Sequence, residues 1–190
     1  MRKSLFRKEV LSSILLFGLL LVITILVDLL LHAIKLVWIG RYLGYAGTFL
    51  IIASFAYSLR KRKIIQWGSP KLFLNFHEYA AWIGSLMVMV HAGIHFNAFL
   101  PWFATCACLV VVASGLTGKF LLKKSTTFVS LKRAAFLKQG ISNTLIEEKL
   151  FWDAVALDVM EKWRTPHIQI TVVFCFLGAF HILTIFMLWQ

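Results

Sequence analysis

Four histidines lie in strongly apolar segments at a matched spacing. His77 and His91 are fourteen residues apart, and His167 and His181 repeat this interval. At about 100° and 1.5 Å per residue, fourteen residues make about four helical turns and rise about 21 Å, so each set projects from one helix face. Histidine inside a membrane span is costly and usually faces the bundle interior or a cofactor. We therefore expect these side chains to do chemistry at two depths of a membrane.

The composition places these histidines in a membrane protein. The 190 residues are 60% hydrophobic and only 15% charged, which is too apolar for one soluble core. A helix needs about 20 apolar residues to cross about 30 Å of hydrocarbon. The sequence predicts an all-α fold, an integral membrane helical bundle of five transmembrane helices, in which residues 1–190 form one domain. The expected spans lie near residues 11–31, 43–59, 76–96, 100–122 and 168–189.

The formal charge of +12 indicates an orientation rather than a nucleic-acid partner. If the N-terminus is cytoplasmic, five alternating spans leave only Lys35 and Arg41, of the 20 basic residues, on the outer side. The positive-inside rule predicts this arrangement, with the C-terminus outside. The basic face would also attract anionic membrane lipid.

The largest polar segment, residues 123–165, is expected to face the cytoplasm. Thr144 and Glu147 have the spacing of a capping box, and apolar residues follow along one side of the next turns. This pattern predicts an amphipathic helix lying on the membrane surface, with a solvated linker as the alternative. Gly140 is expected to end a shorter helix before it.

The direction of the helices turns the spacing into a prediction of ligand pairs. The third and fifth expected spans run the same way, so His77 lies level with His167, and His91 with His181. Two facing neutral imidazoles can bind the iron of a planar tetrapyrrole from both sides. The sequence therefore predicts two b-type haems, one near each side of the membrane, with these four histidines as the axial iron ligands.

Two further residues are candidates for contact with the haems. Gly84 lies midway between His77 and His91, so it would leave room for a flat macrocycle, although ordinary helix packing also favours glycine there. Arg164 lies just before His167, where it could pair with haem propionates or simply anchor the cytoplasmic end of the span.

The string F-H-E-Y-A-A-W-I-G-S-L-M-V-M-V-H-A-G-I-H-F, followed by A-S-G-L-T-G-K-F-L, K-W-R-T-P-H and G-A-F-H-I, resembles the di-haem membrane cytochromes b of the cytochrome b561 and ferric-reductase-like superfamily. The likeness covers about residues 72–190. In such proteins the four span histidines bind haem, which implies that role for His77, His91, His167 and His181. The chain departs from many relatives in having five expected spans rather than six and no attached nucleotide-binding domain.

Three polar residues are expected near the outer surface. Asp28 and His32 are one turn apart at the end of the first span, and His95 has a similar depth. Such a titratable cluster could release protons or hydrogen-bond a quinone, and simple interfacial exposure is the alternative. His95 is also the fallback for His91 as the outer haem ligand, because it lies 18 residues, or five turns, from His77.

The expected function is a membrane electron-transfer subunit in which two bis-histidine haems carry electrons across the bilayer. The chain has no dinucleotide fingerprint, no P-loop and no iron–sulfur cysteine set, so donor and acceptor must come from elsewhere. Expected partners are quinone or quinol and a flavin, iron–sulfur or c-type cytochrome protein, in a bacterial or archaeal cytoplasmic membrane. The alternatives are a self-sufficient quinone or ferric reductase and a haem-free scaffold or transport subunit.

Overall fold

The computed structural model describes residues 2–94 and 99–188, excluding the side chains of 2–10, 121–126, 156, 157, 159–161 and 164. These described residues form helices and connecting turns and no strand. The elements are α1 (Arg2–Ala33), α2 (Ile39–Ser54), α3 (Ala56–Lys61), α4 (Pro70–Ile94), α5 (Phe99–Thr117), the π-helical turn η1 (Gly118–Leu122), α6 (Lys123–Lys138), α7 (Asn143–Lys162) and α8 (Arg164–Leu188).

Four described segments are long and apolar enough to cross a membrane. They are Leu11–Ala33, Ile39–Lys61, Phe99–Phe120 and Thr165–Leu188. The second is longer than the expected 43–59 because α2 and α3 run on as one span. The expected span 76–96 corresponds to α4, which is 25 residues long but is not among the four, since His77, Glu78 and His91 lower its hydropathy. The apolar helices indicate an integral membrane protein, whereas a fifth span and the sidedness of the termini stay predictions.

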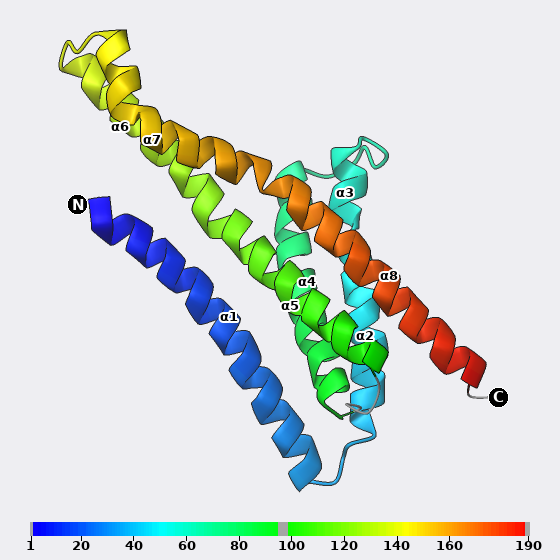
Figure 1. Cartoon of the computed structure of the whole chain (residues 1–190). Helices are drawn as coiled ribbons and strands as arrows, with labels where there is room; N and C mark the ends of the chain where they lie inside the picture. Colours follow the sequence, from blue (N-terminus) through cyan, green and yellow to red (C-terminus); the bar gives the residue numbers. More distant parts are fainter. Residues whose placement is uncertain (1, 95–98, 189–190) are drawn as a thin grey trace.

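The helix α4 lies at the centre of the bundle. It packs most closely against α2 and also contacts α1, α3 and α5, while α8 packs along α5 (Figure 1). A core of Leu20, Met89, Cys108, Val112 and Leu116 joins α1, α4 and α5. Helix α4, which carries His77 and His91, thus contacts four other helices.

Two glycines allow α2 and α4 to touch. A Cβ added to Gly47 would lie 2.8 Å from the carbonyl oxygen of Gly84, and a Cβ on Gly84 would lie 2.9 Å from that of Gly47. Close contact through small residues is the usual way in which membrane helices associate without a hydrophobic driving force. The direction in which a Gly84 side chain would point is therefore filled by α2, and Gly84 serves helix packing rather than leaving space for a macrocycle.

Residues 123–165 contain two paired helices. The helices α6 and α7 pair antiparallel and extend away from the bundle as continuations of α5 and α8 (Figure 1). An ion pair of 2.7 Å between Lys132 and Asp153 joins them, and the buried side chains of Ile146 and Leu150 lie on α7. Helix α6 thus packs against part of α7, while Phe151 and Trp152 are exposed, and contact of α7 with a membrane surface stays a prediction. The predicted end at Gly140 is confirmed: α6 ends at Lys138, and Gly140 has a φ of +71°.

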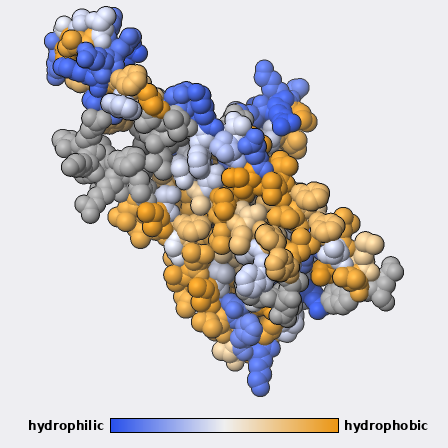
Figure 2. Space-filling view, viewed as in Figure 1, coloured by the Kyte–Doolittle hydropathy of each residue, from blue (hydrophilic) through white to orange (hydrophobic). Residues whose placement is uncertain are grey.

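The surface of the bundle is apolar over the length of the spans. Figure 2 shows hydrophobic side chains over the middle of the molecule and hydrophilic ones at its ends. None of the described side chains of α8 is buried, and α1 exposes many leucines and isoleucines. Such surfaces are suited to contact with lipid tails.

Candidate functional site

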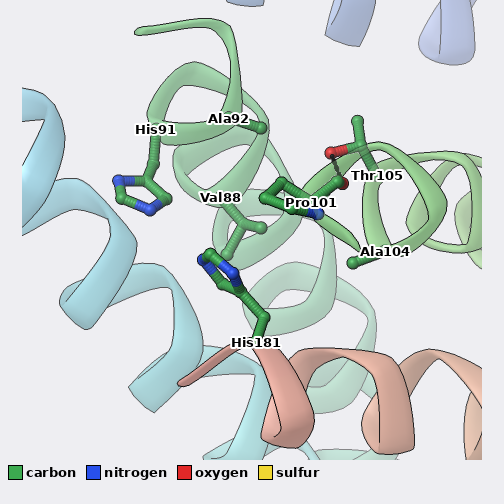
Figure 3. Close-up of a pocket in the computed structure, with 7 residues that line it drawn as sticks. All are labelled: Val88, His91, Ala92, Pro101, Ala104, Thr105 and His181. Atoms are coloured by element: carbon green, nitrogen blue, oxygen red, sulfur yellow. Dashed lines mark hydrogen bonds between the residues drawn. The ribbon is translucent and has the colours of Figure 1, made fainter. Parts of the chain in front are cut away.

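One small cavity lies between α4, α5 and α8, and two of the four histidines line it. His91 from α4 and His181 from α8 both project into it (Figure 3). The remaining lining residues are small or apolar apart from one threonine: Val88, Ala92, Pro101, Ala104 and Thr105. The structure therefore brings together the two imidazoles that the equal spacing predicts as a pair.

A backbone carbonyl of α2 fixes the ring of His91. Its Nδ1 lies 2.9 Å from the carbonyl oxygen of Gly40, so Nδ1 carries the proton and donates it. In a neutral imidazole this assigns the lone pair to Nε2. Gly44 lets α2 approach, because a Cβ there would lie 2.8 Å from the imidazole ring. Metal-binding histidines ordinarily have this support, in which the second ring nitrogen donates to a carbonyl.

The ring of His77 has the same kind of support near the other end of α4. Its Nδ1 donates to the carbonyl oxygen of Ser54 at 3.1 Å. This carbonyl belongs to the last residue of α2, where the backbone leaves the regular ladder and the N–H of Ser58 donates to Phe55. The ring of Tyr57 packs beside the imidazole, with 5.7 Å between ring centres. The break between α2 and α3 thus supplies the acceptor that orients His77.

A buried side chain, rather than a carbonyl, supports His167. Its Nδ1 is hydrogen-bonded to the Oγ of Ser114 on α5 at 3.0 Å. The indole N–H of Trp163 donates to the carbonyl of Ser114 at 3.3 Å, which ties the start of α8 to α5. These contacts place His167 beside α5, and its pairing with His77 stays a prediction.

The tautomer of two of the four predicted ligands suits binding of iron through Nε2. The Nδ1 atoms of His77 and His91 donate to carbonyls, that of His167 is hydrogen-bonded to a hydroxyl, and His181 shares a cavity with His91. No group of three or more His, Cys, Asp or Glu side chains in the described part of the chain is arranged to hold a metal ion. The cavity of about 50 Å³ has room for one or two waters, so a macrocycle would enter only if α8 moved away from α4.

Asp28 and His32, two of the residues predicted near the outer surface, contact each other at the C-terminal end of α1. The Nδ1 of His32 donates to the backbone carbonyl of Asp28 at 2.9 Å and lies 3.6 Å from its Oδ1. That Oδ1 is buried without a hydrogen-bond partner and lies beside Gly93 of α4. His95 and the side chain of Arg164 lie outside the described residues, so a cluster with His95, or an Arg164 contact with propionates, stays a prediction.

Most of the groups that orient the histidines carry no signal in the sequence. Ser114 lies in the quoted string A-S-G-L-T-G-K-F-L, but a serine in an apolar helix carries no signal of a histidine partner. The carbonyls of Gly40 and Ser54 have no side-chain signature at all. A salt bridge of 2.8 Å between Lys119 of η1 and Glu78, next to His77, also went unpredicted.

Comparisons with known proteins leave the family open. The chain matches no family model, no curated protein and no solved structure. Any function must therefore be argued from the residues and their arrangement.

Proposed function

We propose that this protein is a membrane electron-transfer subunit that binds two haems, one between His77 and His167 and one between His91 and His181. The observation that supports it most is the projection of His91 and His181, from helices far apart in the sequence, into one cavity (Figure 3). The proposal extends the resemblance to di-haem cytochromes b, which the comparisons leave untested.

The chain's own residues would bind and orient the cofactor. Haem iron held by two imidazoles cycles between Fe(III) and Fe(II) with no position left open for oxygen or substrate. Donation of Nδ1–H by His77 and His91 keeps the tautomer that presents Nε2, and raises its basicity. The apolar walls exclude water, which is a second means of tuning a redox potential.

The separation of the two histidine levels suits transfer across a membrane. Fourteen residues between His77 and His91 correspond to about 21 Å of helix, most of the thickness of the hydrocarbon core. Two centres at these levels would carry electrons from one side to the other without moving parts. In this proposal the donor and acceptor are the quinone pool and a separate redox protein, because the sequence carries no nucleotide or iron–sulfur motif of its own.

Haem analysis of the purified protein tests the proposal. Protein expressed with ample haem should be red, with a reduced-minus-oxidised band near about 560 nm, the region of bis-histidine haem b. A pyridine assay should find about two haems per chain. Colourless protein with no haem would refute the proposal.

The small cavity favours one competing function, a haem-free membrane subunit in which His91 and His181 pass protons. A space of about 50 Å³ suits one or two waters between imidazoles better than a porphyrin. Proton flux into liposomes that contain the haem-free protein distinguishes the two functions. The proton-transfer function predicts a flux that His181→Ala abolishes, whereas the electron-transfer proposal predicts no flux.

A further inference from the structure

The turn between α3 and α4 forms a closed, ordered loop at the end of a candidate span. The Nε of Arg60 donates to the carbonyl of Gly68 at 2.9 Å, which fastens the two ends of the loop together. Ser69 begins the next helix, because its Oγ accepts from the N–H of Leu72 and Pro70 follows it. The loop is therefore held in one shape and extends directly from the segment Ile39–Lys61.

A lysine occupies the position of this loop where glycine is favoured. The N–H of Lys63 donates to Arg60 and that of Ile64 to Leu59, which is the Schellman arrangement at a helix end. Lys63 is the left-handed residue of this motif, with a φ of +61°. Gly140 fills the equivalent position after α6, with a φ of +71° and the same two hydrogen bonds. The backbone therefore holds Lys63 in one conformation at the helix end.

The loop combines positive charge with exposed apolar side chains. Residues 60–71 contain five basic residues and no acidic one. Within the described part of the chain, Arg62 and Lys63 form no ion pair, and both are exposed. Ile64 and Trp67 are 67% and 72% exposed beside them, and Trp67 is fixed by an edge contact with Phe73. Figure 2 shows hydrophilic side chains gathered at the corresponding end of the molecule.

We propose that this loop binds the headgroups of anionic phospholipids, with Arg62 and Lys63 against the phosphate and Trp67 and Ile64 at the acyl boundary. Tryptophan is enriched at the membrane–water interface, and basic residues next to a span attract anionic lipid. An acidic protein would match the charge but not the two exposed apolar side chains at the end of a span. An anionic lipid therefore matches both the positive charge and the exposed apolar side chains of the loop.

The chain offers a matched control for the test. Lys35 has a φ of +58°, ends α1 and makes the same two Schellman hydrogen bonds. It lies at the opposite end of the bundle from the loop, because α1 begins at the end where α3 lies (Figure 1). Lys63→Gly and Lys35→Gly should therefore relieve the same backbone strain and remove the same helix-end charge. Only Lys63→Gly should affect the proposed lipid site.

The experiment is competition between phosphatidylglycerol and phosphatidylcholine for the detergent-solubilised full chain, read by native mass spectrometry, together with the unfolding temperature. Each basic residue near a membrane surface contributes about fivefold in affinity for anionic lipid. Lys63→Gly and Arg62→Gln should each lower the preference for phosphatidylglycerol by about that factor, and Lys35→Gly should leave it unchanged. Both glycine variants should unfold at or above the wild-type temperature.

Several results would overturn the proposal. They are an equal loss of preference in both glycine variants, no loss in Lys63→Gly and Arg62→Gln, or a lower unfolding temperature for Lys63→Gly alone. Retained lipid preference with lost binding of an acidic partner protein would assign the loop to that partner instead. None of these readouts depends on haem, so the proposed function can fail while this inference stands.

Discussion

Ser114→Ala should weaken one haem site of the two and raise its reduction potential. The Oγ of Ser114 is the partner of the His167 Nδ1, and the residue is only 4% exposed, so water cannot replace the lost hydroxyl at little cost. If His167 binds iron through Nε2, its Nδ1 carries the proton and the Oγ of Ser114 accepts it; this hydrogen bond makes Nε2 a stronger donor to iron, which favours Fe(III). Removing it should favour Fe(II) at that site.

The size of the expected changes in haem affinity and reduction potential follows from the contacts of Ser114. A buried N–H left without a partner costs about 1–3 kcal/mol, and loss of an outer-shell partner of a metal ligand costs about 10- to 100-fold in affinity. If the ferric form loses tenfold more affinity than the ferrous form, the potential rises by about 59 mV, as for any one-electron couple. The other haem, between His91 and His181, should be unchanged because its supporting contact is to Gly40 of α2.

Redox titration followed by haem absorbance measures both potentials at once. Thr117→Val is the matched control, since the Thr117 hydroxyl donates to Ala113 in its own helix and supports no histidine. Unchanged potentials in Ser114→Ala, or equal shifts in the two variants, would refute the assignment of Ser114. If the wild type holds no haem, the ¹⁵N shifts of His167 in the two variants still report whether Ser114 sets the tautomer.

Further predictions concern the ligands and the packing. His77→Ala or His167→Ala should remove one haem and His181→Ala the other, each halving the haem per chain in a pyridine assay; full retention would show that the pairing is wrong. Gly84→Ala should lower the stability by about 1–3 kcal/mol in a denaturation assay, because its Cβ would meet the Gly47 carbonyl and the Ile51 side chain at 2.9 Å, whereas Gly178→Ala, with nothing within 4 Å, should be neutral or stabilising. Asp153→Ala should destabilise the α6–α7 hairpin by about 1.5–3 kcal/mol by leaving Lys132 partly buried without its partner, detected as faster proteolysis of residues 123–162 with unchanged haem content.

The sequence predicted the features that depend on periodicity and on single residue types. Equal spacing placed His91 and His181 at one level because helical rise is nearly constant, and glycine at 140 marked a helix end because few other residues adopt a positive φ. The glycine at 84 was harder to interpret, since helix packing and cofactor space both favour a missing side chain. Only the position of α2 decided between them, and no pattern within α4 carries that information.

The hairpin of α6 and α7 shows a different limit. An apolar stripe on a helix indicates that something covers it, but a membrane surface and a neighbouring helix give the same stripe. Helix α6, from the same polar segment, packs against α7. The ion pair between Lys132 of α6 and Asp153 of α7 can be recognised only when the positions of both helices are known. Contacts between residues 21 positions apart do not follow from either local pattern.

The hydrogen bonds that hold the histidines follow the pairing of the helices. His77 and His91 of α4 are held by carbonyls of α2, and His167 of α8 is held by Ser114 of α5. These contacts follow the closest helix packing, α2 with α4 and α5 with α8, so each histidine and its support belong to the same helix pair. Separation of the two pairs would widen the cavity between His91 and His181 and keep the three hydrogen bonds, but it would also part Met89 of α4 from the core residues of α5. A haem bound as proposed would meet His77 and His91 already in the tautomer that presents Nε2, which would reduce the entropy lost on binding.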